Sequence, residues 1–268
     1  MKNVTANGHE FSVFDAGTGS PIVFVHGFPL NHTMWQGQLD AFADSYRVIA
    51  PDLRGFGNSG VTEGTLTMEQ FADDLNAILD SLGITEPITY CGLSMGGYIG
   101  WQFVRKYGRR IKTLILCDTR AAADSPEGIE NRHRLAETVL EHGPEPALKT
   151  MLPNLVSEKT SNEKPELLKQ LREMIIGTDR RSIAAALLGM SQRPDSTAML
   201  AEITTPTLVI AGAEDKLIPA LEMKQMAEAI PEAKFVEIPH AGHMAPMEDP
   251  QTVNDAMARF LESVNEPA

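Results

Sequence analysis

The residues most capable of chemistry lie near the centre of the chain, where Ser94 stands between Gly92 and Gly96. The β-branched and aromatic run 88–91 precedes them, and a segment with helical spacing follows as far as Val104. A serine between a strand and a helix, with glycine two positions to either side, is typical of a nucleophile on a sharp turn. Such a turn strains the serine backbone and leaves no room for a Cβ at the glycines. It also places the hydroxyl at a helix N-terminus, which favours developing negative charge.

The same pattern also fits an ordinary glycine-rich turn, so a nucleophile needs partners elsewhere in the chain. Serine attacks poorly at neutral pH unless a base accepts its proton. His243 follows the last expected strand and therefore lies at the correct end of the sheet. His240 lies nearer the strand end and fits a solvated loop position. His133, His142 and His9 fit surface positions.

A histidine base needs a carboxylate that holds its tautomer and stabilises its cation. Asp215 follows the expected strand Thr207–Ala211 and precedes His243. The resulting order of serine, aspartate and histidine is the one that accompanies this turn. Asp118, after the strand that follows the nucleophile, remains the alternative acid. Glu214 is adjacent to Asp215, but we expect its side chain to point elsewhere.

A tetrahedral anion on this serine would need two N–H donors about 3 Å from its oxygen. The amide of Met95, directly after the nucleophile, is the first expected donor. The second should come from the loop after the expected strand Ile22–His26. In that loop Gly27 permits a tight turn and the Phe28 amide is the expected donor, whereas Pro29 has no N–H.

Short apolar strands alternate with helical segments in two blocks of the chain. The expected strands are Phe11–Phe14, Ile22–His26, Arg47–Ala50, Ile88–Gly92, Ile111–Cys117, Thr207–Ala211 and Lys234–Ile238. The expected helices are Thr67–Leu82, which begins with a capping box, Met95–Tyr107, Ala220–Ala229 and Thr252–Val264. This alternation is typical of a parallel sheet that is covered by helices on both faces.

The segment between the two blocks has a different composition. Residues 121–203 lack β-branched runs, are rich in Ala, Leu, Glu and Lys, and contain Pro144, Pro146, Pro153 and Pro165, which we expect to break helices. We expect a helical lid over the carboxyl ends of the strands, where ligands bind in open α/β sheets. The predicted organisation is a core made of residues 1–120 and 204–268, with a lid of residues 121–203 inserted into it.

Several motifs, in order along nearly the whole chain, resemble those of the α/β-hydrolase family. They are the loop His26–Pro29, the glycine-rich segment Asp52–Ser59, the turn at Ser94, Gly212 with Asp215, and Gly242 with His243. The resemblance implies an eight-stranded, mostly parallel sheet with a helical lid after the sixth strand. It also assigns the catalytic roles to Ser94, Asp215 and His243, and the oxyanion roles to Phe28 and Met95.

The resemblance implies a carboxylic-ester hydrolase that works through an acyl-enzyme and acts on esters or lactones. The chain is similar to carboxylesterases and enol-lactone hydrolases. Carbon–carbon bond hydrolysis and perhydrolysis on the same triad remain alternatives, as does a ligand receptor or signalling protein with little turnover. A serine at residue 94 argues against haloalkane and epoxide substrates, whose enzymes use an aspartate there. Apolar lid residues suggest a hydrophobic pocket: Met151, Leu152, Leu155, Met174 and Met190.

A second glycine pattern, Gly55–Gly60, fits the dinucleotide-binding fingerprint G-x-G-x-x-G. That fingerprint requires a helix to begin at once, but residues 61–64 intervene before the helix expected at Thr67. A structural loop is therefore the favoured interpretation. The chain also lacks the spacing of a metal site, so we expect neither a metal nor a cofactor.

The composition limits the classes of partner. The net charge is −13, from 36 acidic and 23 basic residues without a basic run, which argues against nucleic acid and anionic membranes. We expect a neutral or weakly charged small-molecule ligand. No early apolar stretch resembles a signal peptide, and Cys91 and Cys117 are expected to be buried and reduced, so a cytoplasmic location is predicted. The sequence gives no indication of an oligomeric state.

Overall fold

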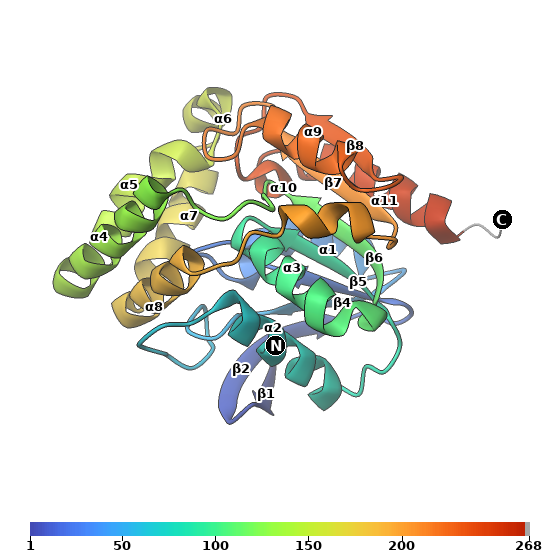
Figure 1. Cartoon of the computed structure of the whole chain (residues 1–268), viewed down its shortest axis with the longest axis horizontal. Helices are drawn as coiled ribbons and strands as arrows, with labels where there is room; N and C mark the ends of the chain where they lie inside the picture. The colour runs from blue at the N-terminus through green and yellow to red at the C-terminus, as the bar shows by residue number, and fades with distance from the viewer. Residues whose placement is uncertain (266–268) are drawn as a thin grey trace.

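An eight-stranded sheet runs through the centre of the computed structural model, which describes residues 1–265 (Figure 1). The strands are β1 (Lys2–Ala6), β2 (His9–Ala16), β3 (Pro21–Val25), β4 (Arg47–Pro51), β5 (Ile88–Leu93), β6 (Ile111–Cys117), β7 (Thr207–Gly212) and β8 (Lys234–Ile238). Their order across the sheet is β1-β2-β4-β3-β5-β6-β7-β8. The pairs β1–β2 and β2–β4 are antiparallel, and the remaining neighbours are parallel. The expected mostly parallel sheet is therefore confirmed.

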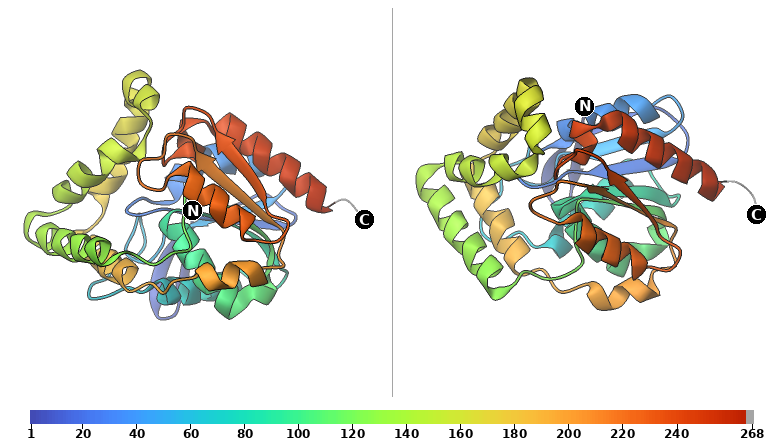
Figure 2. Two further views of the ribbon diagram at one scale, coloured as in Figure 1. Left: turned by 45° about the horizontal axis from the view of Figure 1, so that its top comes forward. Right: turned by 90° about the horizontal axis from the view of Figure 1, so that it is seen from above.

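Helices cover both faces of this sheet. They are α1 (Gln36–Phe42), α2 (Met68–Ser81), α3 (Met95–Tyr107), α9 (Ala220–Glu228), α10 (Ala245–Glu248) and α11 (Pro250–Asn265), with 3-10 turns η1 (His32–Trp35), η2 (Gly108–Arg110) and η3 (Thr197–Glu202). Helix α2 packs on α3, and α1 packs on α11. Figures 1 and 2 show these two pairs on opposite faces. Every residue of β3, β5 and β7 is buried, as expected for central strands covered on both sides.

Strand β1 was not expected from the sequence. Its burial alternates only partly, because Val4 and Ala6 face the core while the other three residues are exposed. The turn to β2 consists of Asn7 and Gly8, with φ values of 48° and 69°. An Asn-Gly pair with positive φ is the preferred two-residue turn of a hairpin, so this pair was a usable signal.

Five helices between β6 and β7 form a separate layer, and we call them the cap helices. They are α4 (Pro126–His142), α5 (Glu145–Leu155), α6 (Glu158–Glu163), α7 (Pro165–Gly177) and α8 (Arg180–Ser191). Helix α4 packs on α8 and α5 on α7, and the group lies beside the sheet, on the left in Figure 1. The division of the chain into core and lid segments stays a prediction.

The prolines of the cap helices do not all act as expected. Pro146 and Pro165 lie in the first turns of α5 and α7, where the missing N–H costs nothing. Pro153 lies inside α5 near its end rather than breaking it. Within residues 1–265, no helix combines the length and apolar character needed to cross a bilayer.

Candidate active site

Ser94 joins the end of β5 to the start of α3 in a strained conformation, with φ 54° and ψ −112°. The strain is tolerated because the chain packs very closely here. A Cβ at Gly92 would lie 2.6 Å from the Gly96 carbonyl, and a Cβ at Gly96 would lie 2.2 Å from the Val25 oxygen. No side chain fits at either position, so the two glycines are required by the approach of β3, β5 and α3.

Four hydrogen bonds fix the backbone of Ser94. Its N–H donates to the Cys117 carbonyl at 3.0 Å, which ties the turn to β6. Its carbonyl accepts from the amides of Gly97 and Tyr98 at 2.9 and 3.1 Å, and from Thr119 Oγ1 at 2.8 Å. The hydroxyl is thereby held at the N-terminus of α3, where the Met95 amide has no carbonyl partner within the helix.

His243 and Asp215 form a buried pair. His243 Nδ1 donates to Asp215 Oδ2 at 2.7 Å, and the two residues are 2 % and 8 % exposed. The other carboxylate oxygen accepts from the amides of Leu217 and Ile218 at 2.7 and 3.0 Å. These bonds fix the carboxylate and the tautomer of the ring, so that Nε2 of the neutral imidazole is left as an acceptor.

The alternative acid, Asp118, has a different environment. Its Oδ1 accepts from the Gly212 amide at 2.7 Å, while Oδ2 is buried without a partner among the described residues. Burial, with the charge of Asp215 adding to it, raises the Asp118 pKa well above its ordinary range. Glu214 points away, as expected, toward the exposed His240 at 3.5 Å.

A cavity of about 660 Å³ brings the candidate residues together, since Ser94, His243 and Phe28 all line it. The cap helices supply much of its wall through α4, α5 and α8. The apolar lining residues from these helices are Leu135, Pro146, Met151, Leu187 and Met190. Met151 and Met190, which were expected at a hydrophobic pocket, are therefore among the lining residues. Leu152, Leu155 and Met174 are not among the lining residues, and the last two are buried in the core cluster.

The loop that carries Phe28 is braced by His26, a residue whose role the sequence did not reveal. His26 Nδ1 donates to the Gly27 carbonyl at 2.9 Å, and His26 Nε2 accepts from the Leu53 amide at 3.0 Å. The ring is fully buried, and desolvation lowers the pKa of His26 to about 4. A neutral ring can donate on one side and accept on the other, which joins the Phe28 loop to the segment after β4.

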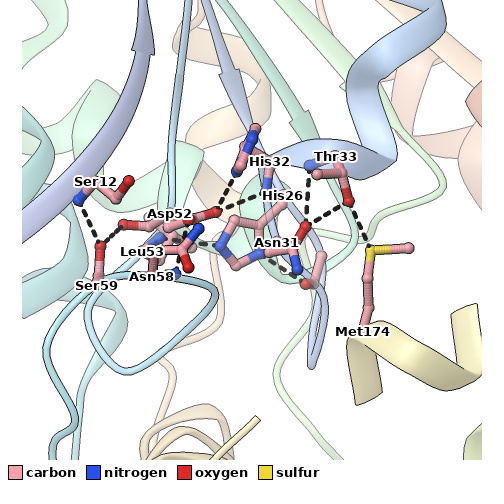
Figure 3. A network of polar contacts seen from close by, with 11 residues as sticks. Ser12, His26, Asn31, His32, Thr33, Asp52, Leu53, Asn58, Ser59 and Met174 are labelled. Atoms are coloured by element: carbon pink, nitrogen blue, oxygen red, sulfur yellow. Dashed lines mark hydrogen bonds and ion pairs between the residues drawn. The ribbon is translucent and has the colours of Figure 1, made fainter. Parts of the chain in front are cut away.

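Asp52 organises the segment beside this loop (Figure 3). Its side chain accepts from the amide and Nδ1 of His32 at 2.9 and 2.7 Å, and from the Asn58 amide at 2.9 Å. Burial opposes ionisation, but these hydrogen bonds hold the Asp52 pKa below its ordinary value. Ser59 Oγ donates to the Asp52 carbonyl at 2.6 Å and accepts from the Ser12 amide at 3.0 Å. Gly55–Gly60 is thus held as a structural loop, in agreement with the favoured interpretation.

Glu248, at the end of α10, holds the loop that carries His243. Its Oε1 accepts from the amides of Gly242 and Met244 at 2.8 and 3.2 Å, and its Oε2 accepts from the Ser157 amide at 2.9 Å. The carboxylate is 2 % exposed and bonds to the backbone on both sides of the histidine and to the start of α6. Sequence reasoning missed it, although an acid that closes the apolar run 244–247 was a signal.

Comparisons with known proteins agree with this architecture. Residues 20–250 match the family model described as alpha/beta hydrolase fold. The structure superposes on an esterase from Thermogutta terrifontis, solved with malate bound, with a TM-score of 0.96 and 46% identity over 99% of each chain.

Two curated relatives carry different names. A 3-oxoadipate enol-lactonase from Acinetobacter baylyi is 28% identical over 95% of this chain and 93% of its own length. A non-heme chloroperoxidase, CPO-A1, from Kitasatospora aureofaciens is 40% identical over 42% of this chain and 41% of its own length. The similarity therefore reaches proteins named for more than one reaction.

The low pKa of His26 predicts a specific pH dependence of stability. In the unfolded chain His26 takes up a proton below about pH 6.5, whereas in the folded protein it does so only near pH 4. The unfolded state therefore binds more protons between these values, and stability falls as pH falls through them. Between pH 7 and pH 5 the free energy of unfolding of the wild type should fall by about 2 kcal/mol more than that of His26→Gln, as measured by urea unfolding. The exposed His142 is the control, and the free energy of unfolding of His142→Gln should depend on pH as that of the wild type does.

Replacing Glu248 by glutamine should destabilise the fold. An amide NH₂ in place of one carboxylate oxygen cannot accept a hydrogen bond, so a buried backbone donor is left unpaired. We expect the free energy of unfolding to fall by about 1–3 kcal/mol. The exposed Glu262 on α11 provides a matched substitution, and Glu262→Gln should change it by less than about 0.5 kcal/mol. Equal effects of the two variants would contradict this role for Glu248.

Proposed function

We propose, on the premise that the chain belongs to the α/β-hydrolase fold family, that it is a serine hydrolase of carboxylic esters or lactones. One observation carries the proposal: Asp215 fixes the His243 ring at 2.7 Å, and that ring lines the same cavity as the strained Ser94. The esterase and enol-lactonase names of the relatives support this class of substrate.

The first half of the reaction forms an acyl-enzyme. Ser94 Oγ attacks the substrate carbonyl while His243 Nε2 accepts its proton, and Asp215 stabilises the imidazolium. The negative oxygen of the tetrahedral intermediate accepts hydrogen bonds from the amides of Phe28 and Met95. A preorganised donor of this kind contributes about 3 kcal/mol of transition-state stabilisation.

The second half regenerates the enzyme. His243 returns its proton to the leaving alkoxide, so the carbon–oxygen bond breaks and the alcohol is released. In a lactone the alcohol stays joined to the acyl group. Water then attacks the acyl-enzyme while His243 accepts a proton from it. The second intermediate collapses, His243 returns this proton to Ser94 Oγ, and the carboxylic acid is released.

The name of the chloroperoxidase relative favours perhydrolysis as a second candidate. In that reaction hydrogen peroxide replaces water as the attacking group. The acyl-enzyme then yields a peroxycarboxylic acid and free Ser94. In a reaction that contains an ester and hydrogen peroxide, release of more peracid than carboxylic acid would favour perhydrolysis. Release of carboxylic acid alone would favour hydrolysis.

Removing the nucleophile should abolish turnover. We expect Ser94→Ala to reduce kcat on 4-nitrophenyl butyrate by at least about 10³-fold, because the acyl-enzyme cannot form. Ser263→Ala, an exposed change on α11, should retain wild-type activity. Circular dichroism would establish that both variants fold. Undiminished activity of Ser94→Ala would contradict the assignment of the nucleophile.

A pair of matched substitutions distinguishes the two candidate acids. Asp215→Asn should lower kcat on the order of 10³- to 10⁴-fold, because an amide cannot hold the required tautomer of His243. Asp118→Asn should lower kcat less than about tenfold, because the asparagine oxygen can still accept from the Gly212 amide and its NH₂ takes the place of Oδ2, which has no partner among the described residues. The reverse ranking would assign the acid role to Asp118.

A further inference from the structure

The charge of the cavity wall is opposite to that of the whole protein. Of the five charged residues that line the cavity, four are basic and one, Asp124, is acidic. The basic residues are Arg120, Arg132, Arg134 and Lys149. The chain as a whole has a net charge of −13. A recess lined mainly by one sign of charge attracts a ligand of the opposite sign. An anionic ligand differs from the neutral or weakly charged ligand that the composition led us to expect.

Arg132, on α4, is the basic lining residue best prepared for a ligand. Its Nε donates to Asp124 Oδ2, and its Nη2 lies 3.4 Å from Asp124 Oδ1, so the guanidinium is held in place. Its Nη1 contacts the Met190 sulfur at 3.4 Å, and no stronger acceptor meets it within residues 1–265. A thioether is a weak acceptor, so this nitrogen retains most of its capacity to donate.

Asp124 cannot neutralise this part of the wall alone, because it is shared between two arginines. Arg193 Nη1 lies 2.7 Å from Asp124 Oδ2, and the Arg193 side chain is 4% exposed. Its guanidinium stacks 4.2 Å from the ring centre of Tyr98, another lining residue. Two guanidinium groups against one carboxylate leave a net positive charge at the wall.

The other basic lining residues either pair with an acidic side chain or are more exposed to solvent than Arg132. Arg120 Nη2 lies 3.0 Å from both Glu222 Oε2 and the Leu217 carbonyl. Arg134 is 65% exposed and pairs with Glu130 on its own helix. Lys149 is exposed. These residues add to the potential of the cavity, whereas Arg132 offers a fixed donor.

Resting on the proposed function, we infer that the cavity takes esters or lactones that carry a second, ionised carboxylate, and that Arg132 binds this group. A guanidinium fits a carboxylate in geometry as well as charge. The arrangement also explains why a chain so rich in acids holds basic side chains in this place. The reacting carbonyl would lie at Ser94 and the carboxylate against α4.

Two esters that differ in one charge test this inference. They are mono(4-nitrophenyl) adipate, which is an anion, and its neutral methyl ester. In the wild type the ratio of kcat/KM for the anion to that for the neutral ester should be about ten to one hundred, the range expected for a charge-assisted hydrogen bond. Arg132→Gln should bring the ratio close to one, mainly through a higher KM for the anion. Arg132→Lys should restore part of it.

The control is Arg172→Gln on α7, which removes the same charge from a side chain that is 55% exposed and does not line the cavity. It should leave the ratio unchanged. A second measurement needs no variant: raising NaCl from about 0.02 to 0.5 M should reduce the wild-type ratio severalfold by screening.

Each outcome has a distinct meaning. A wild-type ratio near or below one, a ratio insensitive to salt, or equal ratios for Arg132→Gln and Arg172→Gln would overturn the inference. If Ser94-dependent cleavage of the neutral ester persisted in that case, the proposed function would stand. Absence of cleavage of both esters would overturn the proposed function and this inference with it.

Discussion

The candidate site depends on one steric constraint, the close approach of the start of α3 to β3 and β5. Gly96 lies so near Val25 that no side chain fits between them, and a Cβ at Gly92 would collide with the Gly96 carbonyl. Ser94 at this approach has a positive φ and lines the cavity. The cost of the strained residue is offset by the buried strands around it, because a rigid core over-determines the turn.

The fold was largely predictable because its central strands are continuous apolar runs and its glycine turns are local signals. Strand β1 escaped prediction because only Val4 and Ala6 are buried, which leaves too weak an alternation. The strained turn at Ser94 and the structural role of Gly55–Gly60 followed from short-range steric rules. The expectation that prolines break the cap helices was wrong for Pro146 and Pro165, because a proline in the first turn of a helix does not end it.

The supporting residues of the candidate site were harder to predict, since they act through contacts between distant segments. His26 bridges two loops, and Asp124 is shared by arginines from α4 and the segment after α8. Nothing in local spacing indicates such pairings. Asp118 and Asp215 both follow strands, and only the three-dimensional environment separates an acid bonded to the Gly212 amide from one bonded to a histidine.

The Glu248 carboxylate couples the position of His243 to the cap helices. Because it bonds the backbone beside His243 and also the amide of Ser157, the loop that carries His243 is held against the start of α6. A hinge at Ser157 would break a buried hydrogen bond and displace the ring. The end of α5 joins the same assembly, because the Met244 amide also donates to the Leu155 carbonyl at 3.0 Å, so the cavity wall that α5 supplies is anchored to the backbone beside His243.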